Sequence, residues 1–193
     1  MSRWMSVRVC VFTIAIGTMA NTSFAQTRPP ADVAVGVVLR EGTKNLPKAW
    51  VASAGFPITP FVSIEFAGNG AYSTGPAEGL GPTVEASSRA HEIVAGVRVT
   101  PFFNDRIRTF GHFLVGPRFS TLDLTDGASL NASTSLKSAI VHLGAGLDVG
   151  SRRLAARFLY DRVFSKVVKS TGDIEDKTWH ANNRLTAWIV LGF

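Results

Sequence analysis

The stretch "NNRLTAWIVLGF", residues 182–193, decides the fold of this chain. Every second position is apolar and the last of them is aromatic: Leu185, Ala187, Ile189, Leu191 and Phe193. The positions between them are mixed and include Arg184 and Thr186. A period of two is the signature of a β-strand with two unlike faces. Because chain ends are usually polar and poorly ordered, we expect the apolar face to be covered, either by lipid or by a core.

The beginning of the chain predicts export. Residues 1–25 start with two arginines and no acidic residue, continue with a short apolar run and end in small residues. This pattern is typical of a cleaved signal peptide, and we expect cleavage after Ala25. The apolar run is too short for a transmembrane helix, which needs about 20 residues. The expected organisation is therefore a signal peptide at 1–25, a linker at 26–31 and one domain at 32–193.

The composition excludes several classes of function. The single cysteine, Cys10, lies in the expected signal peptide, so the exported protein has no disulfide. The formal net charge of +6 is scattered, without the Lys/Arg-rich run that marks nucleic-acid binding. No apolar stretch after Ala25 is long enough for a membrane-spanning helix. The four histidines are separated in the sequence, and we expect no metal site and no cofactor.

Alternating segments follow one another through the expected domain. The predicted strands lie at about 32–40, 50–56, 62–67, 89–100, 106–122, 140–149, 154–161 and 182–193. Long polar loops are predicted at 41–48, 68–88, 123–135 and 166–181, with short turns between the other strands. Strands of roughly ten residues can cross a bilayer, and alternating long and short connections are typical of outer-membrane barrels. The pattern predicts an all-β, eight-stranded antiparallel up-and-down transmembrane β-barrel.

The less apolar face of these strands predicts a charged barrel interior. A narrow eight-stranded barrel is filled by side chains, and buried charges must be paired. The face is rich in glycine, which lets the walls approach, and its strand positions use arginine where a solvated face would more often carry lysine. The predicted interior charge network comprises Glu65, Glu92, Arg98, Arg118, Asp148, Arg157, Asp161 and Arg184. For Arg157 we predict an ion pair with one or more of the carboxylates in this network.

Aromatic residues gather near the strand ends, which predicts two girdles at the membrane interfaces. At the short-turn end lie Phe56, Phe61, Phe102, Phe103 and Phe193, and at the long-loop end lie Trp50, Phe164 and Trp179. The alternative is that the thirteen phenylalanines fill an ordinary core. Pairing of the last strand with the first would close the sheet and remove its exposed edges.

With these features together, the chain resembles the small outer-membrane β-barrel proteins of Gram-negative bacteria, of the OmpA/OmpX transmembrane-domain type. The resemblance rests on the signal peptide, the hairpins "AWVASAGFPITPFVSIEFAG" (49–68) and "HLGAGLDVGSRRLAARFLYDR" (142–162), and the terminal strand. It implies that Phe193, Leu191 and Ile189 form a C-terminal signal read by the barrel-assembly machinery. No peptidoglycan-binding domain is expected after the barrel.

This resemblance implies a non-enzymatic, porin-like protein of the cell envelope, located in the outer membrane. We expect short periplasmic turns, longer extracellular loops and a structural or surface-interaction role. Eight strands leave no room for a constitutive aqueous pore, and a narrow gated path stays open as a question. The implied partners are membrane lipid, lipopolysaccharide and the barrel-assembly machinery, with no nucleic acid, and we expect a monomer.

Two alternatives remain at this point. A soluble periplasmic or secreted barrel that binds a small apolar ligand would turn its apolar face inward, so that Ile93 and Leu143 line a cavity while Arg98 and Arg157 face water. A barrel enzyme that modifies lipid A needs a serine beside a histidine base. Near His180, however, Asn182 stands where the nucleophile would be, so the enzyme is the weaker alternative.

Overall fold

The structure, a computed structural model, describes residues 31–41, 49–76, 84–104, 106–126, 131–170 and 178–193. The signal peptide predicted at 1–25 lies outside the described residues, as does the linker except for Ala31. Within the described ranges, no helix has the length and apolar character that crossing a membrane requires.

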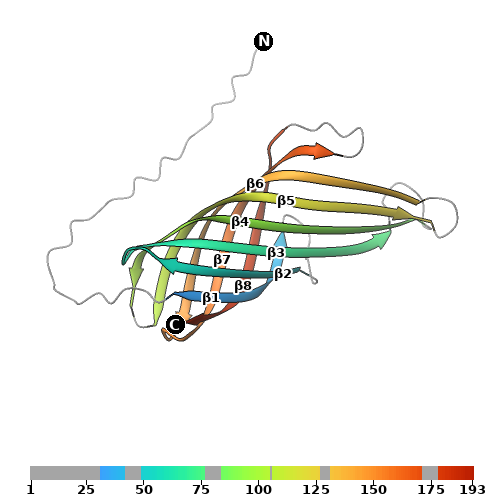
Figure 1. Ribbon diagram of the computed structural model, residues 1–193. Helices are drawn as coiled ribbons and strands as arrows, with labels where there is room; N and C mark the ends of the chain where they lie inside the picture. The colour runs from blue at the N-terminus through green and yellow to red at the C-terminus, as the bar shows by residue number, and fades with distance from the viewer. Residues whose placement is uncertain (1–30, 42–48, 77–83, 105, 127–130, 171–177) are drawn as a thin grey trace, which may run out of the picture.

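Eight strands form one closed sheet (Figure 1). They are β1 Asp32–Glu41, β2 Ala49–Pro57, β3 Val62–Pro76, β4 Glu85–Phe103, β5 Ile107–Thr125, β6 Asn131–Gly150, β7 Leu154–Ser170 and β8 His180–Gly192. Each strand pairs antiparallel with the next, and β1 pairs with β8 from Asp32↔Gly192 to Glu41↔Arg184. The predicted all-β, eight-stranded antiparallel up-and-down barrel is confirmed.

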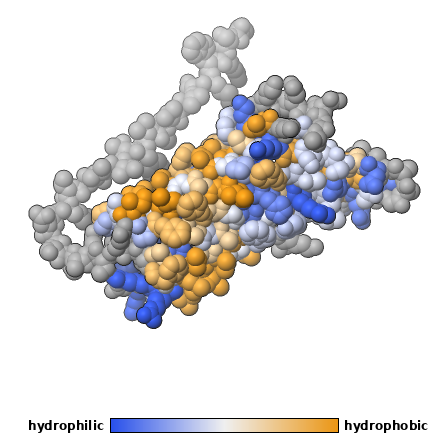
Figure 2. Space-filling view, in the orientation of Figure 1, coloured by the Kyte–Doolittle hydropathy of each residue, from blue (hydrophilic) through white to orange (hydrophobic). Residues whose placement is uncertain are grey.

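The apolar face of the wall points outward. Ile93 is 67% exposed and Leu143 is 56% exposed, whereas Arg98 is 4% exposed and Arg157 is 1% exposed. The space-filling view shows the same arrangement as a hydrophobic surface over the barrel wall (Figure 2). This orientation is the reverse of the one that the soluble ligand-binding alternative requires, and that alternative is wrong because its expected ligand cavity is filled with charged side chains.

The closing strand follows its predicted parity. Leu185, Ile189 and Leu191 on β8 are exposed on the outer surface, while Arg184 and Thr186 are buried inside. Phe193 follows the strand, and its backbone N–H donates a 2.9 Å hydrogen bond to the carbonyl oxygen of Ala31. The end of the chain is therefore fixed to the beginning of β1.

Close contact between β4 and β5 requires two glycines. A Cβ atom placed on Gly96 would overlap the carbonyl oxygen of Phe113, and one placed on Gly116 would overlap the carbonyl oxygen of Ile93. In both cases the obstacle is backbone, which cannot rotate away as a side chain can. These two positions of the wall accept only glycine at the observed strand spacing.

The described parts of the long loops predicted at 68–88, 123–135 and 166–181 are largely strand, which corrects the prediction, whereas the loop predicted at 41–48 lies outside the described residues except for Glu41. β3 runs on to Pro76 and pairs there with the first residues of β4, while β5 runs on to Thr125 and pairs with the first residues of β6. β7 likewise reaches Ser170, and β8 begins at His180. Serine, threonine, glycine and alanine are typical of loops, but ladder hydrogen bonds from neighbouring strands hold these segments extended without an apolar face.

Four strand ends extend beyond the rest of the barrel as a protruding sheet (Figure 1). We define this protruding sheet by its aligned segments at 72–76, 85–89, 121–125 and 131–135. The pairing of β2 with β3 ends at Ala49↔Ala71, and that of β6 with β7 ends at Leu136↔Ser170. Hydrophilic surface covers this part of the molecule (Figure 2). The C-terminus lies at the opposite end of the barrel.

Candidate functional site

The barrel interior contains three groups of charged side chains, one after another along its length. We call them the turn-end cluster, which lies nearest the short connections, the central cluster and the loop-end cluster. The connections at 58–61, 104–106 and 151–153 define the turn end. The interior surface is formed by the side chains of alternate residues, so each strand contributes to the clusters at every second position.

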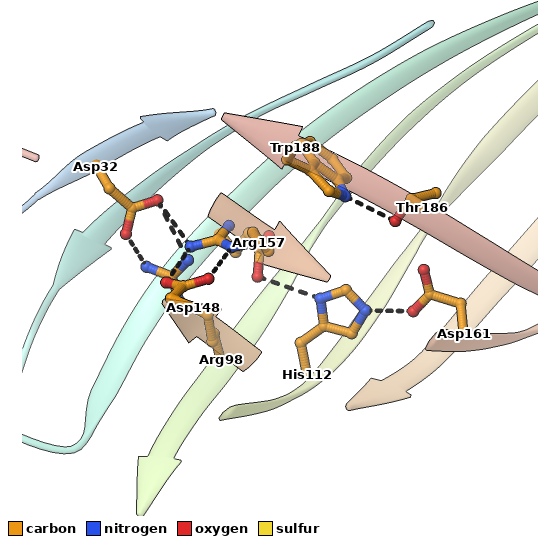
Figure 3. Close-up of polar contacts among 9 residues, drawn as sticks. Asp32, Arg98, His112, Asp148, Arg157, Asp161, Thr186 and Trp188 are labelled. Atoms are coloured by element: carbon orange, nitrogen blue, oxygen red, sulfur yellow. Dashed lines mark hydrogen bonds and ion pairs between the residues drawn. The ribbon is translucent and has the colours of Figure 1, made fainter. Parts of the chain in front are cut away.

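The turn-end cluster joins two carboxylates to three guanidinium groups. Figure 3 shows Asp32, Asp148, Arg98 and Arg157 of this cluster. Arg157 Nε lies 2.7 Å from Asp148 Oδ1, and its Nη2 lies 3.1 Å from Asp148 Oδ2 and 3.4 Å from Asp32 Oδ1. Arg98 binds both oxygens of Asp32. Arg108 Nη2 adds a contact of 3.5 Å to Asp148 Oδ2. The cluster thus ties β1, β4, β5, β6 and β7 together across the lumen.

An aromatic ring supports the same guanidinium groups. The centroid of Phe110 lies 4.8 Å from Cζ of Arg157 and 5.7 Å from Cζ of Arg98. Cation–π contacts of this kind strengthen when the cation is desolvated. A side chain on Gly146 would overlap the Phe110 ring, so this glycine makes room for it. The sequence analysis assigned Phe110 neither to the interior nor to a girdle, so its inward position, at 4% exposure, is a finding of the structure.

The central cluster places a histidine between two carboxylates (Figure 3). His112 Nδ1 lies 3.2 Å from Glu65 Oε2, and its Nε2 lies 2.6 Å from Asp161 Oδ1. A ring with an acceptor on both nitrogens suits an imidazolium, which donates from both. A Cβ on Gly144 would overlap Asp161 Oδ1, so the absence of a side chain there leaves space for the pair.

In the loop-end cluster, Arg184 lies between two glutamates. Its Nη2 is 2.9 Å from Glu92 Oε1 and 3.1 Å from Glu41 Oε2, and its Nη1 is 3.0 Å from Glu92 Oε2. Arg118 Nη1 makes longer contacts, at 3.3 Å to Glu92 and 3.5 Å to Glu41. Both glutamates therefore touch both arginines, in an arrangement where each charge is neutralised by more than one partner.

Little free space separates the central and loop-end clusters. Glu92 also contacts Asn69 and lies 3.3 Å from Nε2 of His142. A cavity of about 20 Å³ lies beside these residues, which is room for about one water molecule. The interior can hold paired charges in place, and this cavity is too small for a larger ligand.

All eight residues of the predicted network lie in these clusters, and the structure adds members that the prediction left out. The added residues are Asp32, Glu41, Arg108, His112 and His142. Glu41 was assigned to the loop predicted at 41–48, and simple alternation along β1 would turn its side chain outward. A bulge between Val38 and Arg40 changes the parity and places Glu41 opposite Arg184. Asp32 lies two residues before Ala34 and so on the same, inner face of β1. This alternation is the sequence signal that could have added Asp32 to the predicted network.

The outer surface carries the predicted aromatic positions. Exposed aromatic side chains at the turn end are Phe56, Phe61, Phe102 and Phe193, and Trp50 and Trp179 are exposed near the other end. The side chain of Phe103 lies outside the described set. An open cleft of about 210 Å³ lies at the loop end beside Glu41 and Arg118, with Ser73, Ser88 and Asn182 in its wall.

The structure gives no support to the lipid A-modifying alternative. Asn182 lines the open cleft instead of occupying an enclosed site. His180 Nε2 lies 3.2 Å from the hydroxyl of Thr178, but both side chains are exposed to solvent. A nucleophile–base pair that works on an acyl chain needs a third group to orient it and a pocket to hold the substrate.

Comparisons with known proteins agree with this architecture. No protein-family model and no curated protein matches the chain. Ail, the attachment invasion locus protein of Yersinia pestis, matches with a TM-score of 0.56 and 13% identity over 86% of this chain and 100% of Ail. A second Ail structure, in complex with the heparin analogue sucrose octasulfate, matches with a TM-score of 0.54, 14% identity and the same coverage.

A third structure is the N-terminal β-barrel domain of Pseudomonas aeruginosa OprF, with a TM-score of 0.45 and 10% identity over 86% of this chain and 98% of that domain. Identities this low show the fold alone. The chain has the fold of the small eight-stranded barrels of the outer membrane. Because no family model matches, membership of the OmpA/OmpX type remains a prediction.

Proposed function

We propose that this protein is a non-enzymatic integral outer-membrane barrel with a structural or surface-interaction role. The observation that carries the proposal is the orientation of the wall, with apolar side chains outside and thirteen charged or histidine side chains of the described residues gathered inside. Lipid is the environment that covers such a surface, as it does in outer-membrane barrels. Export through the signal peptide at 1–25 delivers the chain to that membrane.

The protruding sheet supports a role at the cell surface. With the turn end in the periplasm, as in outer-membrane barrels, the protruding sheet lies outside the cell. Among the described residues, β3 has only β4 as a strand neighbour over 72–76, and β6 has only β5 as a strand neighbour over 131–135. Each of these two segments is therefore a border of the protruding sheet. An extended peptide can add to a sheet border of this kind through main-chain hydrogen bonds. Membrane lipid, lipopolysaccharide and the barrel-assembly machinery are the other proposed partners, with the barrel acting as a monomer.

The proposed location is tested by fractionation of cells that express the full chain. We expect the mature protein in the outer-membrane fraction, soluble only in detergent, and migrating faster on a gel before boiling than after it. The mobility difference arises because a closed barrel stays folded in detergent until it is heated. Recovery of the protein from a detergent-free periplasmic extract would refute the proposal.

Replacing Phe193 by alanine tests the proposed assembly signal. Phe193 is 73% exposed, so its ring contributes little to the packing of the folded barrel. We expect the variant to accumulate several-fold less assembled barrel in cells, measured as the heat-modifiable band. Phe102→Ala is the matched control, because Phe102 is also an exposed aromatic residue at the turn end. Equal losses in the two variants would contradict a special role for the terminal residue.

A further inference from the structure

The open cleft at the loop end lies where the barrel interior meets solvent. It has a volume of about 210 Å³, and the charged residues in its described wall are Glu41 and Arg118. Ser73, Ser88 and Asn182 add hydroxyl and amide groups to the wall, and their side chains are exposed or half-buried. We call this space the mouth cleft. It is smaller than the pockets of about 300–1,000 Å³ that hold drug-sized ligands, so it suits a small polar group.

Arg118 has hydrogen-bonding capacity that the loop-end cluster does not use. Arg184 contacts the two glutamates through Nε, Nη1 and Nη2 at 2.9–3.2 Å, and its side chain is 3% exposed. Arg118 contacts the same glutamates through Nη1, at 3.3 and 3.5 Å, and its side chain is 22% exposed. Since a guanidinium carries five N–H donors, Nε and Nη2 of Arg118 can donate to a ligand in the mouth cleft.

Glu41 provides the complementary acceptor. Its Oε2 accepts hydrogen bonds from Nε and Nη2 of Arg184, whereas its Oε1 accepts the long 3.5 Å contact from Arg118. A hydroxyl group both donates and accepts, so two neighbouring hydroxyls of a ligand can donate to Glu41 Oε1 and accept from Arg118. The loop-end cluster contains two arginines and two glutamates, whose formal charges cancel. The mouth cleft therefore favours a ligand that has hydroxyl groups and no net charge.

The protruding sheet continues the wall of the mouth cleft as a face without charge. Alternation along β4 places Ser88 on the same, inner face as the buried Glu92. The residues that pair side by side in the row of Ser88 are Ser73, Leu122 and Thr134. The charged residues of the protruding sheet lie at the alternate positions, on the outer face, and are Glu85, Arg89 and Asp123. Hydroxyl groups beside apolar side chains match a sugar ring, which has hydroxyls at its rim and C–H groups on its faces.

We propose that the mouth cleft binds a neutral saccharide, whose neighbouring hydroxyl groups contact Glu41 and Arg118. Ser88 and Asn182 provide further hydrogen-bonding groups, and the uncharged row of the protruding sheet supports the next sugar residue. The saccharide arrives from the aqueous side, because the protruding sheet extends beyond the rest of the barrel (Figure 1). The inference rests on the proposed function, since it assigns a ligand class to the surface-interaction role and requires the loop end to lie outside the cell.

Binding can be measured with the mature barrel in a phosphocholine detergent, because maltoside and glucoside detergents carry sugar headgroups that would compete. The probes are neutral trisaccharides of glucose, galactose and mannose at millimolar concentration, followed by saturation-transfer NMR. We expect at least one of these probes to bind. A trisaccharide of uronic acids is expected to bind no more tightly, because the charges of the loop-end cluster cancel.

Two variants test the assigned contacts. Ser88→Val removes a hydroxyl group and fills part of the mouth cleft, while Arg118→Lys keeps the positive charge and removes the planar guanidinium. We expect each variant to bind the probe at least about tenfold more weakly, since hydrogen bonds to the ligand are lost. Ser87→Val is the matched control, because Ser87 is the preceding residue of β4 and lies on the outer face, opposite Asp123. The control is expected to bind like the wild type.

The outcomes separate this inference from the proposed function. Absence of binding by a heat-modifiable wild-type barrel, undiminished binding by Ser88→Val, or an equal loss in Ser87→Val would overturn the saccharide site while leaving the membrane barrel intact. Tighter binding of the uronic acid probe would show a site for carboxylates, and would also overturn it. If one variant fails to refold, the other decides. Failure of the wild type to fold as a heat-modifiable barrel would refute the proposed function itself, and the saccharide site with it.

Discussion

Replacing Arg157 by methionine is expected to lower the free energy of unfolding by about 3–5 kcal/mol, the usual cost of removing one partner from a buried ion pair. Arg157 is 1% exposed and contacts both Asp148 and Asp32. Methionine fills much of the same volume but leaves these carboxylates with fewer donors in the barrel interior. Urea unfolding of the barrel in vesicles, followed by tryptophan fluorescence, measures the effect.

A paired substitution identifies the cause of the loss. Arg157→Met combined with Asp148→Leu removes the charge of both partners, and apolar replacement of a whole buried pair is often close to neutral. We expect the double variant to be more stable than Arg157→Met alone. The control is Arg153→Met, which changes an exposed arginine in the short connection between β6 and β7. A double variant less stable than the single one would show that packing, rather than unpaired charge, explains the result.

The turn-end cluster also explains why the interior uses arginine. A guanidinium can donate to two carboxylates at once and still lie flat against a ring. Arg157 does both, since it contacts Asp148 and Asp32 while its Cζ lies 4.8 Å from the centroid of Phe110. Lysine has a single charged nitrogen and could not reproduce this geometry. The preference for arginine at inward strand positions is therefore a consequence of the narrow lumen.

Within strand segments that contain no bulge, the side of the wall on which a residue lies could be predicted from the sequence. Alternation assigns Ile189 to the outside and Arg184 to the inside without any knowledge of partners, and the structure places them there. Alternation also places Trp188 inside, although a hydrophobic side chain would be expected on the apolar outer face, and the structure buries it. Its buried indole Nε1 donates a 2.6 Å hydrogen bond to Thr186 Oγ1, so its polar group is satisfied inside the barrel.

Strand ends and bulges could not be predicted in this way. The segment 72–76 has the composition of a loop, and only its pairing with 85–89 makes it a strand. That pairing depends on where the neighbouring strand lies, which a local pattern does not contain. Likewise, the bulge beside Arg40 leaves no mark in the alternation of β1, yet it decides both the outward position of Arg40 and the inward position of Glu41.

The sequence also could not predict which side chains contact one another within each cluster. Arg98 binds Asp32, which is 66 positions away in the sequence. His112 on β5 touches Glu65 on β3 and Asp161 on β7. Which residues meet across the lumen depends on the tilt of the strands and the stagger of the closed sheet. The sequence predicts which charges face the lumen, while closure of the barrel determines how they pair.

Replacing Gly96 by valine is expected to prevent normal closure of the barrel. A Cβ on Gly96 would overlap the Phe113 carbonyl oxygen and approach Cα of Leu114 to 2.9 Å. Because both atoms belong to the backbone of β5, the strain is relieved only if β4 and β5 separate and their ladder hydrogen bonds are lost. Overpacking of this kind costs about 3 kcal/mol or more. We expect at least a tenfold loss of the heat-modifiable form after refolding into detergent.

Gly75→Val is the matched control for this prediction. Gly75 also lies in a strand, but a Cβ placed there meets no atom within 4 Å. Valine favours extended backbone, so the control is expected to refold as well as the wild type. If Gly96→Val refolded equally well, β4 and β5 would have to tolerate a wider separation than the observed one. If both variants failed, the loss would reflect a general intolerance of valine in these strands, and the close contact at Gly96 would not be its cause.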